Sequence, residues 1–86
     1  MAKTIFTSQH REFVEALRDV RRAASVTQVQ LSERLGKDQS YISNLERGQR
    51  RLDVIEFIAI AAALNRDAPD LFAEISARLK PTRRQQ

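Results

Sequence analysis

Residues 26–48 read VTQVQLSERLGKDQSYISNLERG, and this stretch decides the fold. Two segments with helical apolar spacing flank a Gly-Lys-Asp tripeptide. Thr27 and Gln30 have the spacing of a capping box, which predicts the start of the first helix. Gly36 suits the left-handed residue after that helix, and Asp38 suits the N-cap of the next one. The stretch therefore predicts two short helices joined by a tight turn, a helix-turn-helix unit.

The rest of the chain also has the pattern of helices. It contains only two glycines and two prolines, and the alternating apolar and polar runs that are typical of strands are nearly absent. The predicted fold class is therefore all-α, a compact five-helix bundle. The helices are expected over residues 9–24, 28–35 and 39–47, after Asp53, and from near Pro69. The expected apolar face of the first helix consists of Phe13, Leu17, Val20 and Ala24.

Length and composition exclude several classes of protein. A chain of 86 residues has room for one domain, which we expect over residues 1–80, followed by a flexible basic tail at 81–86. With no cysteine and one histidine, His10, the sequence has no disulfide framework and no thiolate or histidine metal cluster. His10 has no catalytic partner at a recognisable spacing, so we expect a surface residue there. We expect no metal, no cofactor and no enzyme activity.

The sequence also lacks the features of a membrane or secreted protein. Its longest mostly apolar run, residues 54–64, is interrupted by Glu56 and is shorter than the about 20 residues of a membrane-spanning helix. The first residues, MAKTIFTSQHREF, lack the apolar segment of a secretory signal. We therefore expect a cytoplasmic protein without a membrane partner.

Net charge is weak evidence for nucleic-acid binding here, because residues 78–86 carry all of the net +4 and residues 1–77 sum to zero. The placement of side chains is more informative. Residues 39–47 put Ile42 and Leu45 on one helix face and polar side chains on the opposite face. A solvated face has the same pattern, but the preceding helix and turn favour a helix that reads DNA bases between phosphate contacts. The flanking basic residues are Arg34, Lys37, Arg47, Arg50 and Arg51.

The stretch resembles the phage repressor/Cro class of helix-turn-helix proteins, the XRE-type family. The matching elements are Thr27-Gln28, Ser32, Gly36, Ile42 and Glu46-Arg47-Gly48. The resemblance extends from the first helix to Phe72 and implies a compact bundle of about five helices. It also implies a two-fold dimer on palindromic DNA, with half-sites about one helical turn apart.

The resemblance implies roles for the polar residues of the helix expected over residues 39–47. Gln39, Ser40 and Asn44 would meet base edges, with Ser43 as a further candidate. Amide side chains pair bidentately with adenine. Because no arginine points outward from the first turn of this helix, we expect a preference for A·T contacts. Arg47 could still reach a guanine.

Further residues would contact the DNA backbone. Gln28 matches a glutamine that often binds the backbone, and its place at a helix N-terminus favours phosphate. Arg50 and Arg51 are expected to bind phosphates. Two roles stay open for Tyr41, a hydroxyl contact to phosphate or packing between helices. Arg47 is either a backbone contact or a solvated arginine.

In the family that the chain resembles, an arginine of the first helix pairs with the glutamate that Glu46 matches. The resemblance therefore implies a structural ion pair between Arg21 and Glu46. Breaking such a partly buried pair on one side would destabilise the fold by roughly several kcal/mol. The sequence departs from the family at Ser32, where alanine is common, and the Ser32 hydroxyl should bind a backbone carbonyl.

A dimer needs an apolar surface beyond the core. Ile55, Ala59 and Ala62 form one such stripe on the fourth helix. The fifth helix offers a second candidate around Leu71 and Ile75, although these residues could instead cover the domain core. We expect a homodimer through these two helices.

The sequence thus predicts a transcriptional regulator that binds a palindromic operator in double-stranded DNA and is associated with the nucleoid. Candidates are a Cro-like repressor, a restriction-modification controller and an antitoxin, with polymerase or a toxin as the protein partner. Two alternatives stay open. A protein-interaction module with this fold is supported by the neutral charge of residues 1–77. A non-specific nucleoid protein would bind without sequence preference and with a strong response to salt.

Overall fold

The computed structural model describes residues 8–79, and within them the protein is all-α, as predicted. The helices are α1 (Ser8–Ala23), α2 (Gln28–Leu35), α3 (Gln39–Glu46), α4 (Val54–Ala63) and α5 (Ala68–Ser76). The ends of the first three helices lie within a residue of the expected bounds. The expected tail at 81–86 lies outside the described residues.

Helix ends are set by the predicted caps, with one exception. At α2, the Thr27 hydroxyl accepts from the Gln30 backbone N–H at 3.0 Å and Gln30 closes the capping box. Gly36 then adopts a left-handed φ of 69°. Asp38 has the extended backbone of an N-cap, but its side chain makes no capping hydrogen bond. Asp38 is thus the N-cap of α3 as predicted, but the capping hydrogen bond expected from its side chain is not formed.

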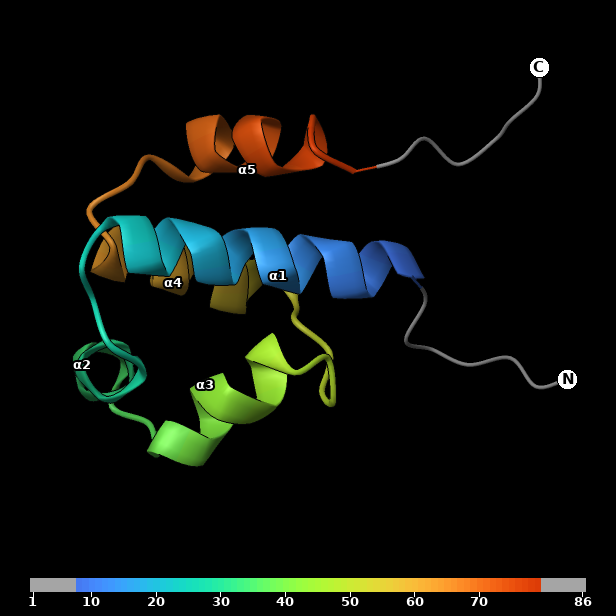
Figure 1. Cartoon of the computed structure of the whole chain (residues 1–86). Helices are drawn as coiled ribbons and strands as arrows, with labels where there is room; N and C mark the ends of the chain where they lie inside the picture. The colour runs from blue at the N-terminus through green and yellow to red at the C-terminus, as the bar shows by residue number, and fades with distance from the viewer. Residues whose placement is uncertain (1–7, 80–86) are drawn as a thin grey trace, which may run out of the picture.

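Helix α1 lies between two parts of the molecule. It packs against α3 on one side and against α5 on the other, while α4 lies behind it (Figure 1). Helix α2 contacts both α3 and α4. Helix α3 is thus at the side of the molecule away from α5, and its outer face is not covered by another helix of the described residues (Figure 1).

The buried face of α1 is different from the expected stripe. Val14 and Ala16 are almost completely buried together with Leu17 and Val20, whereas Phe13 is half-buried and Ala24 is exposed. The reason is that α1 is covered from two directions, so its buried face is broader than a single stripe. Ala24 follows the last helical residue and turns away from the core.

The core excludes one of the two predicted dimer surfaces. Leu71 and Ile75 are both 0% exposed, so their side chains have no surface to offer a partner. They cover the domain core, which was the alternative reading of that face. Ser32 is a second correction, because its buried Oγ has no hydrogen-bond partner in the described part of the chain.

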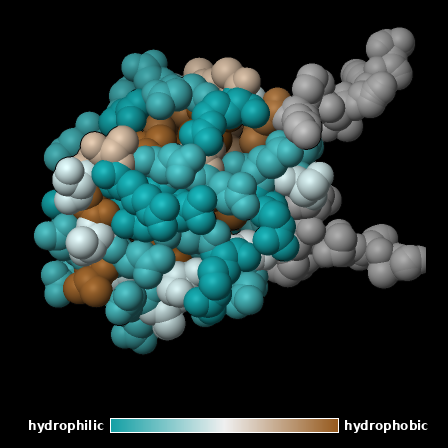
Figure 2. Space-filling view, viewed as in Figure 1, coloured by the Kyte–Doolittle hydropathy of each residue, from teal (hydrophilic) through white to brown (hydrophobic). Residues whose placement is uncertain are grey.

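The surface differs between faces. The face seen in Figure 2 is mostly hydrophilic, with small and separate apolar patches. Large exposed apolar side chains occur on α4, which lies behind α1 in Figure 1, at Val54, Ile55 and Ile58. None of the helices in residues 8–79 has the length and apolar character needed to cross a membrane.

Candidate nucleic-acid interface

The outer face of α3 carries the polar side chains that the helical wheel predicted. Gln39 and Ser40 are exposed in its first turn. Ile42 and Leu45 point into the core and are each 1% exposed. This burial fixes the rotation of α3, so its first turn presents amide and hydroxyl groups outward.

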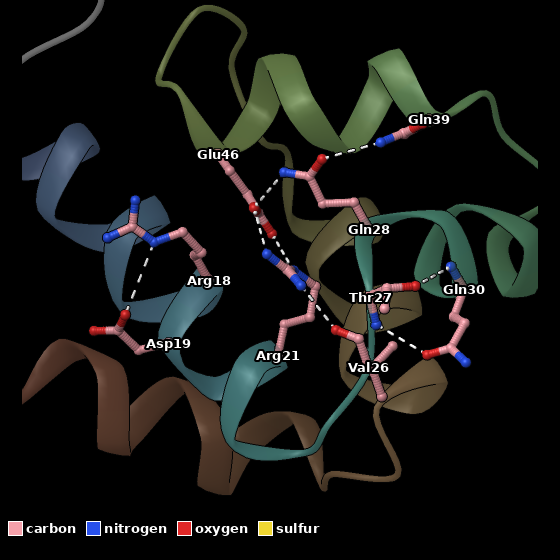
Figure 3. A network of polar contacts seen from close by, with 9 residues as sticks. All are labelled: Arg18, Asp19, Arg21, Val26, Thr27, Gln28, Gln30, Gln39 and Glu46. Atoms are coloured by element: carbon pink, nitrogen blue, oxygen red, sulfur yellow. Dashed lines mark hydrogen bonds and ion pairs between the residues drawn. The ribbon is translucent and has the colours of Figure 1, made fainter.

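A chain of hydrogen bonds connects the core to this face (Figure 3). The Arg21 guanidinium donates to both carboxylate oxygens of Glu46, at 2.6 and 2.9 Å. Gln28 Nε2 donates to Glu46 Oε1 at 2.9 Å, and Gln39 Nε2 donates to Gln28 Oε1 at 3.4 Å. We call this chain of hydrogen bonds, from Arg21 through Glu46 and Gln28 to Gln39, the relay. It joins α1, α2 and α3, and it orients the amides of Gln28 and Gln39 before any ligand is bound.

The inner end of the relay is the ion pair that the resemblance implied. The side chains of Arg21 and Glu46 are each only 7% exposed. A third hydrogen bond, from Arg21 Nη1 to the Val26 carbonyl at 2.8 Å, holds the turn between α1 and α2. Because the buried charges are paired and further hydrogen-bonded, the pair stabilises the arrangement of three helices at one point.

At the other end of α3, Arg47 binds side chains of its own segment. It donates to Ser43 Oγ at 2.8 Å, to Asn44 Oδ1 at 2.7 Å and to Gln49 Oε1 at 3.2 Å. The sequence predicted that Arg47 either contacts the DNA backbone or is solvated, and it did not predict these three hydrogen bonds. Arg47 occupies one of the two lone pairs of the Asn44 oxygen, which leaves the second lone pair and the amide nitrogen for further hydrogen bonds.

The predicted phosphate contact Arg50 is already engaged. Its Nη2 lies 3.0 Å from Glu56 Oε2, and its guanidinium carbon lies 4.5 Å from the centre of the Tyr41 ring. Lys37 Nζ lies 5.3 Å from the same ring. Tyr41 is half-buried, and both cations lie close enough to its ring for cation–π attraction. Tyr41 also packs against the hydrophobic core, and the contact of its hydroxyl with phosphate stays a prediction.

Burial and charge shift the pKa values of Tyr41 and Glu56 in this cluster. Partial burial and the nearby Glu56 carboxylate raise the pKa of Tyr41. Burial alone would raise the pKa of Glu56, but hydrogen bonds from Arg50 and from the Asp53 backbone N–H lower it overall. The Asp-x-x-Glu spacing of Asp53 and Glu56 is typical of a capping box but carries no signal for the contact of Glu56 with Arg50.

Three other positions complete the description of this side. His10 is half-buried, with Nε2 3.1 Å from the Arg50 carbonyl oxygen, so the expected surface role was wrong. Arg34 donates to the Ala63 carbonyl at the end of α4, at 2.8 Å. Arg51 is exposed and pairs with no carboxylate of residues 8–79.

Comparisons with known proteins agree with this geometry. The helix-turn-helix family HTH_3 matches residues 17–71. An XRE-family like protein from Pseudomonas syringae pv. tomato str. DC3000 is 36% identical over 81% of this chain and 85% of its own, with a TM-score of 0.74. The chain belongs to the XRE family of helix-turn-helix proteins. It is therefore a DNA-binding transcriptional regulator. The members of this family are transcriptional regulators and not enzymes.

Other solved structures are similar to the chain in fold. The restriction-modification controller protein C.AhdI from Aeromonas hydrophila is 32% identical over 77% of this chain and 100% of its own, with a TM-score of 0.70. The clp gene regulator ClgR from Corynebacterium glutamicum is 25% identical over 84% of this chain and 77% of its own, with a TM-score of 0.72. No curated protein sequence matches the chain.

Proposed function

We propose that this XRE-family protein binds a palindromic operator as a homodimer and regulates transcription through that site. The observation that carries the proposal is the relay from Arg21 through Glu46 and Gln28 to Gln39. Base recognition needs side chains held in a defined geometry. The relay supplies this geometry without using an exposed charge on the outer face of α3.

We assign base contacts to Gln39, Ser40, Ser43 and Asn44, and backbone contacts to four residues around them. The two amides favour A·T pairs, because each can pair bidentately with adenine. One of the four backbone contacts is Gln28, at the N-terminus of α2, because a helix N-terminus favours a phosphate. The remaining backbone contacts are Arg47, Arg50 and Arg51.

The homodimer is proposed to form through α4. Val54 and Ile55 are 73% and 72% exposed at its start, and Ile58, Ala59 and Ala62 are exposed further along. Val54 and Ile58 also line an apolar groove of about 800 Å³ between the starts of α1 and α4 and helix α5. Exposed apolar side chains that are gathered on one helix mark an interaction surface, and a second copy supplies the two-fold symmetry of a palindrome.

Among the candidate roles, the full-length match to C.AhdI favours a restriction-modification controller over a Cro-like repressor or an antitoxin. Such a protein would act at the nucleoid in the cytoplasm, by excluding polymerase from a promoter or contacting it there. In the antitoxin role the protein partner would instead be a toxin.

The test is selection of duplexes from a random DNA pool at physiological salt, since low salt inflates non-specific binding. We expect a palindrome with half-sites about one helical turn apart and A·T pairs at the base contacts. Gln39→Ala with Asn44→Ala should abolish the enrichment, and Glu15→Ala, at an exposed position of α1, is the control. A folded wild-type protein that enriches no motif would contradict the proposal, and would favour a protein-interaction module or a non-specific DNA binder.

A further inference from the structure

Arg50 is held by a carboxylate in the geometry that a phosphate would use. Its Nη2 donates to Glu56 Oε2 at 3.0 Å, and its Nη1 lies 3.4 Å from Oε1. Two parallel N–H···O contacts are also how a guanidinium binds a phosphate group. Glu56 therefore occupies the edge of Arg50 that is best suited to the DNA backbone.

Glu56 cannot move outward with Arg50, because it is tied to the start of α4. Its Oε1 accepts from the Asp53 backbone N–H at 3.0 Å, and its own N–H donates to Asp53 Oδ1 at 2.7 Å. A phosphate on the same edge of Arg50 would lie against an anchored carboxylate of like charge. The Arg50 edge can therefore hold one anion at a time.

Release of Arg50 would cost little. The side chain of Arg50 is 35% exposed and that of Glu56 is 23% exposed. Breaking an ion pair that is partly exposed to water changes an equilibrium constant by less than about tenfold. The capping box of α4 does not involve Arg50, so α4 keeps its N-terminal bonds after the exchange. Neighbouring Arg51, by contrast, has no carboxylate partner among residues 8–79 and needs no exchange.

We propose that Glu56 limits the affinity of this protein for DNA by competing with backbone phosphate for Arg50. Binding exchanges the Arg50–Glu56 pair for an Arg50–phosphate pair, so Arg50 contributes less than an unpaired arginine would. Glu56 is thus a positioning residue that acts through Arg50 and touches no base. The inference rests on the proposed DNA contact of Arg50.

The experiment measures affinity for a mixed-sequence DNA duplex as a function of salt, for wild type, Glu56→Gln, Arg50→Gln and the double variant. Glutamine can close the capping box as glutamate does, so α4 should stay formed. Glu74→Gln is the control, because Glu74 pairs with Arg66 at the α5 side of the molecule and its loss makes the same change in net charge.

We expect Glu56→Gln to bind about three- to tenfold more tightly than wild type. The slope of log affinity against log salt should steepen by up to about one, because the carboxylate that wild type releases on binding takes up a cation and glutamine does not. In the Arg50→Gln background both effects should vanish. The proposal is overturned if Glu56→Gln matches Glu74→Gln, if it weakens binding, or if the gain persists without Arg50.

A second measurement on the free protein checks the cluster itself. Tyr41 is the one tyrosine of a chain without tryptophan, so the phenol absorbance titration reports this site alone. Partial burial raises the pKa of Tyr41 and the Glu56 carboxylate raises it further, so Glu56→Gln should lower that pKa. An unchanged value would put Glu56 outside this cluster and would overturn the contact with Arg50 on which the proposal depends. If wild type binds no duplex at low salt, the proposed function fails and the inference fails with it. If wild type binds and Glu56→Gln behaves as the control, only the inference fails.

Discussion

Glu46 makes three hydrogen bonds to two side chains, and they connect stability to the candidate site. Two come from the buried guanidinium of Arg21 and one from the amide of Gln28. The pair is nearly inaccessible to water, so each charge depends on the other. At the scale of single residues, this carboxylate therefore both stabilises the fold and positions a proposed DNA contact.

Glu46→Gln should unfold at a much lower urea concentration than wild type. The substitution leaves the Arg21 cation buried without its counter-charge, and breaking a buried pair on one side costs about 3–5 kcal/mol. The free energy of unfolding from urea titration measures this loss. Replacing both partners, with Arg21→Met and Glu46→Leu, should recover much of it. A loss below about 1 kcal/mol in Glu46→Gln would show that the pair does not hold the helices together.

Ser32→Ala should stabilise the protein. The Ser32 hydroxyl is buried and has no partner within residues 8–79, and an unsatisfied buried polar group costs about 1–3 kcal/mol. Alanine also has a higher helix propensity than serine, by about 0.5 kcal/mol. Ser40→Ala, at an exposed position of α3, controls for propensity. If thermal or urea unfolding gives equal gains at both positions, the Ser32 hydroxyl carries no penalty.

At the scale of elements, the helices are too short to be stable alone. Both α2 and α3 have eight residues, whereas isolated helices below about 12 residues are marginal in water. Caps and packing therefore decide whether each one forms. The start of α4 is the best example, since Asp53 and Glu56 bind each other's backbone N–H groups and Glu56 also pairs with Arg50.

The protein should lose stability in acid partly through this cap. The pKa of Glu56 is lowered in the folded protein, so the unfolded chain binds the proton more readily than the folded one. The stabilisation is therefore complete above the ordinary carboxyl pKa and is lost as pH falls through the lowered value. Urea unfolding measured at several pH values should show a smaller loss in acid for Glu56→Gln than for wild type. Parallel pH profiles for the two proteins would contradict this assignment.

At the scale of the whole molecule, two surfaces lie on different elements. The polar outer face of α3 is the proposed DNA contact, and the exposed apolar start of α4 is the proposed dimer contact. Phe72, which is 53% exposed on α5, extends the apolar surface, and its ring centre lies 6.0 Å from those of Phe13 and Phe57, tilted to the first ring and edge-on to the second. Helices α1 and α2 hold the two surfaces in a fixed relation.

Ile55→Glu should give a folded monomer. Ile55 is 72% exposed, so the core is unaffected, and an acid in the first turn of a helix is compatible with the helix dipole. Sedimentation equilibrium should show a dimer for wild type and a dimer dissociation constant raised at least about tenfold in the variant, a change of about 1.4 kcal/mol. Val29→Glu, at an exposed aliphatic position of α2, is the matched control. Equal association of Ile55→Glu and wild type would exclude this part of α4 as the interface.

The amino-acid sequence by itself determined the five helices, most of their caps and the family. These features depend on residues three or four positions apart, and local spacing records them directly. The Arg21–Glu46 pair also followed from the sequence, because the family motif links two positions that are distant along the chain.

Only the tertiary structure decided which side chains the folded chain leaves accessible. The crossing of α5 over α1 buries Leu71 and Ile75, and the close packing of α2 leaves the Ser32 hydroxyl without a partner in the described part of the chain. The loop after α3 brings Arg50 to Glu56 and Tyr41, a contact between three segments that helical periodicity does not encode. Burial and ion pairing depend on how the helices cross in space. The spacing of apolar residues along the sequence indicates which face of a helix is apolar, but it does not indicate how two helices cross.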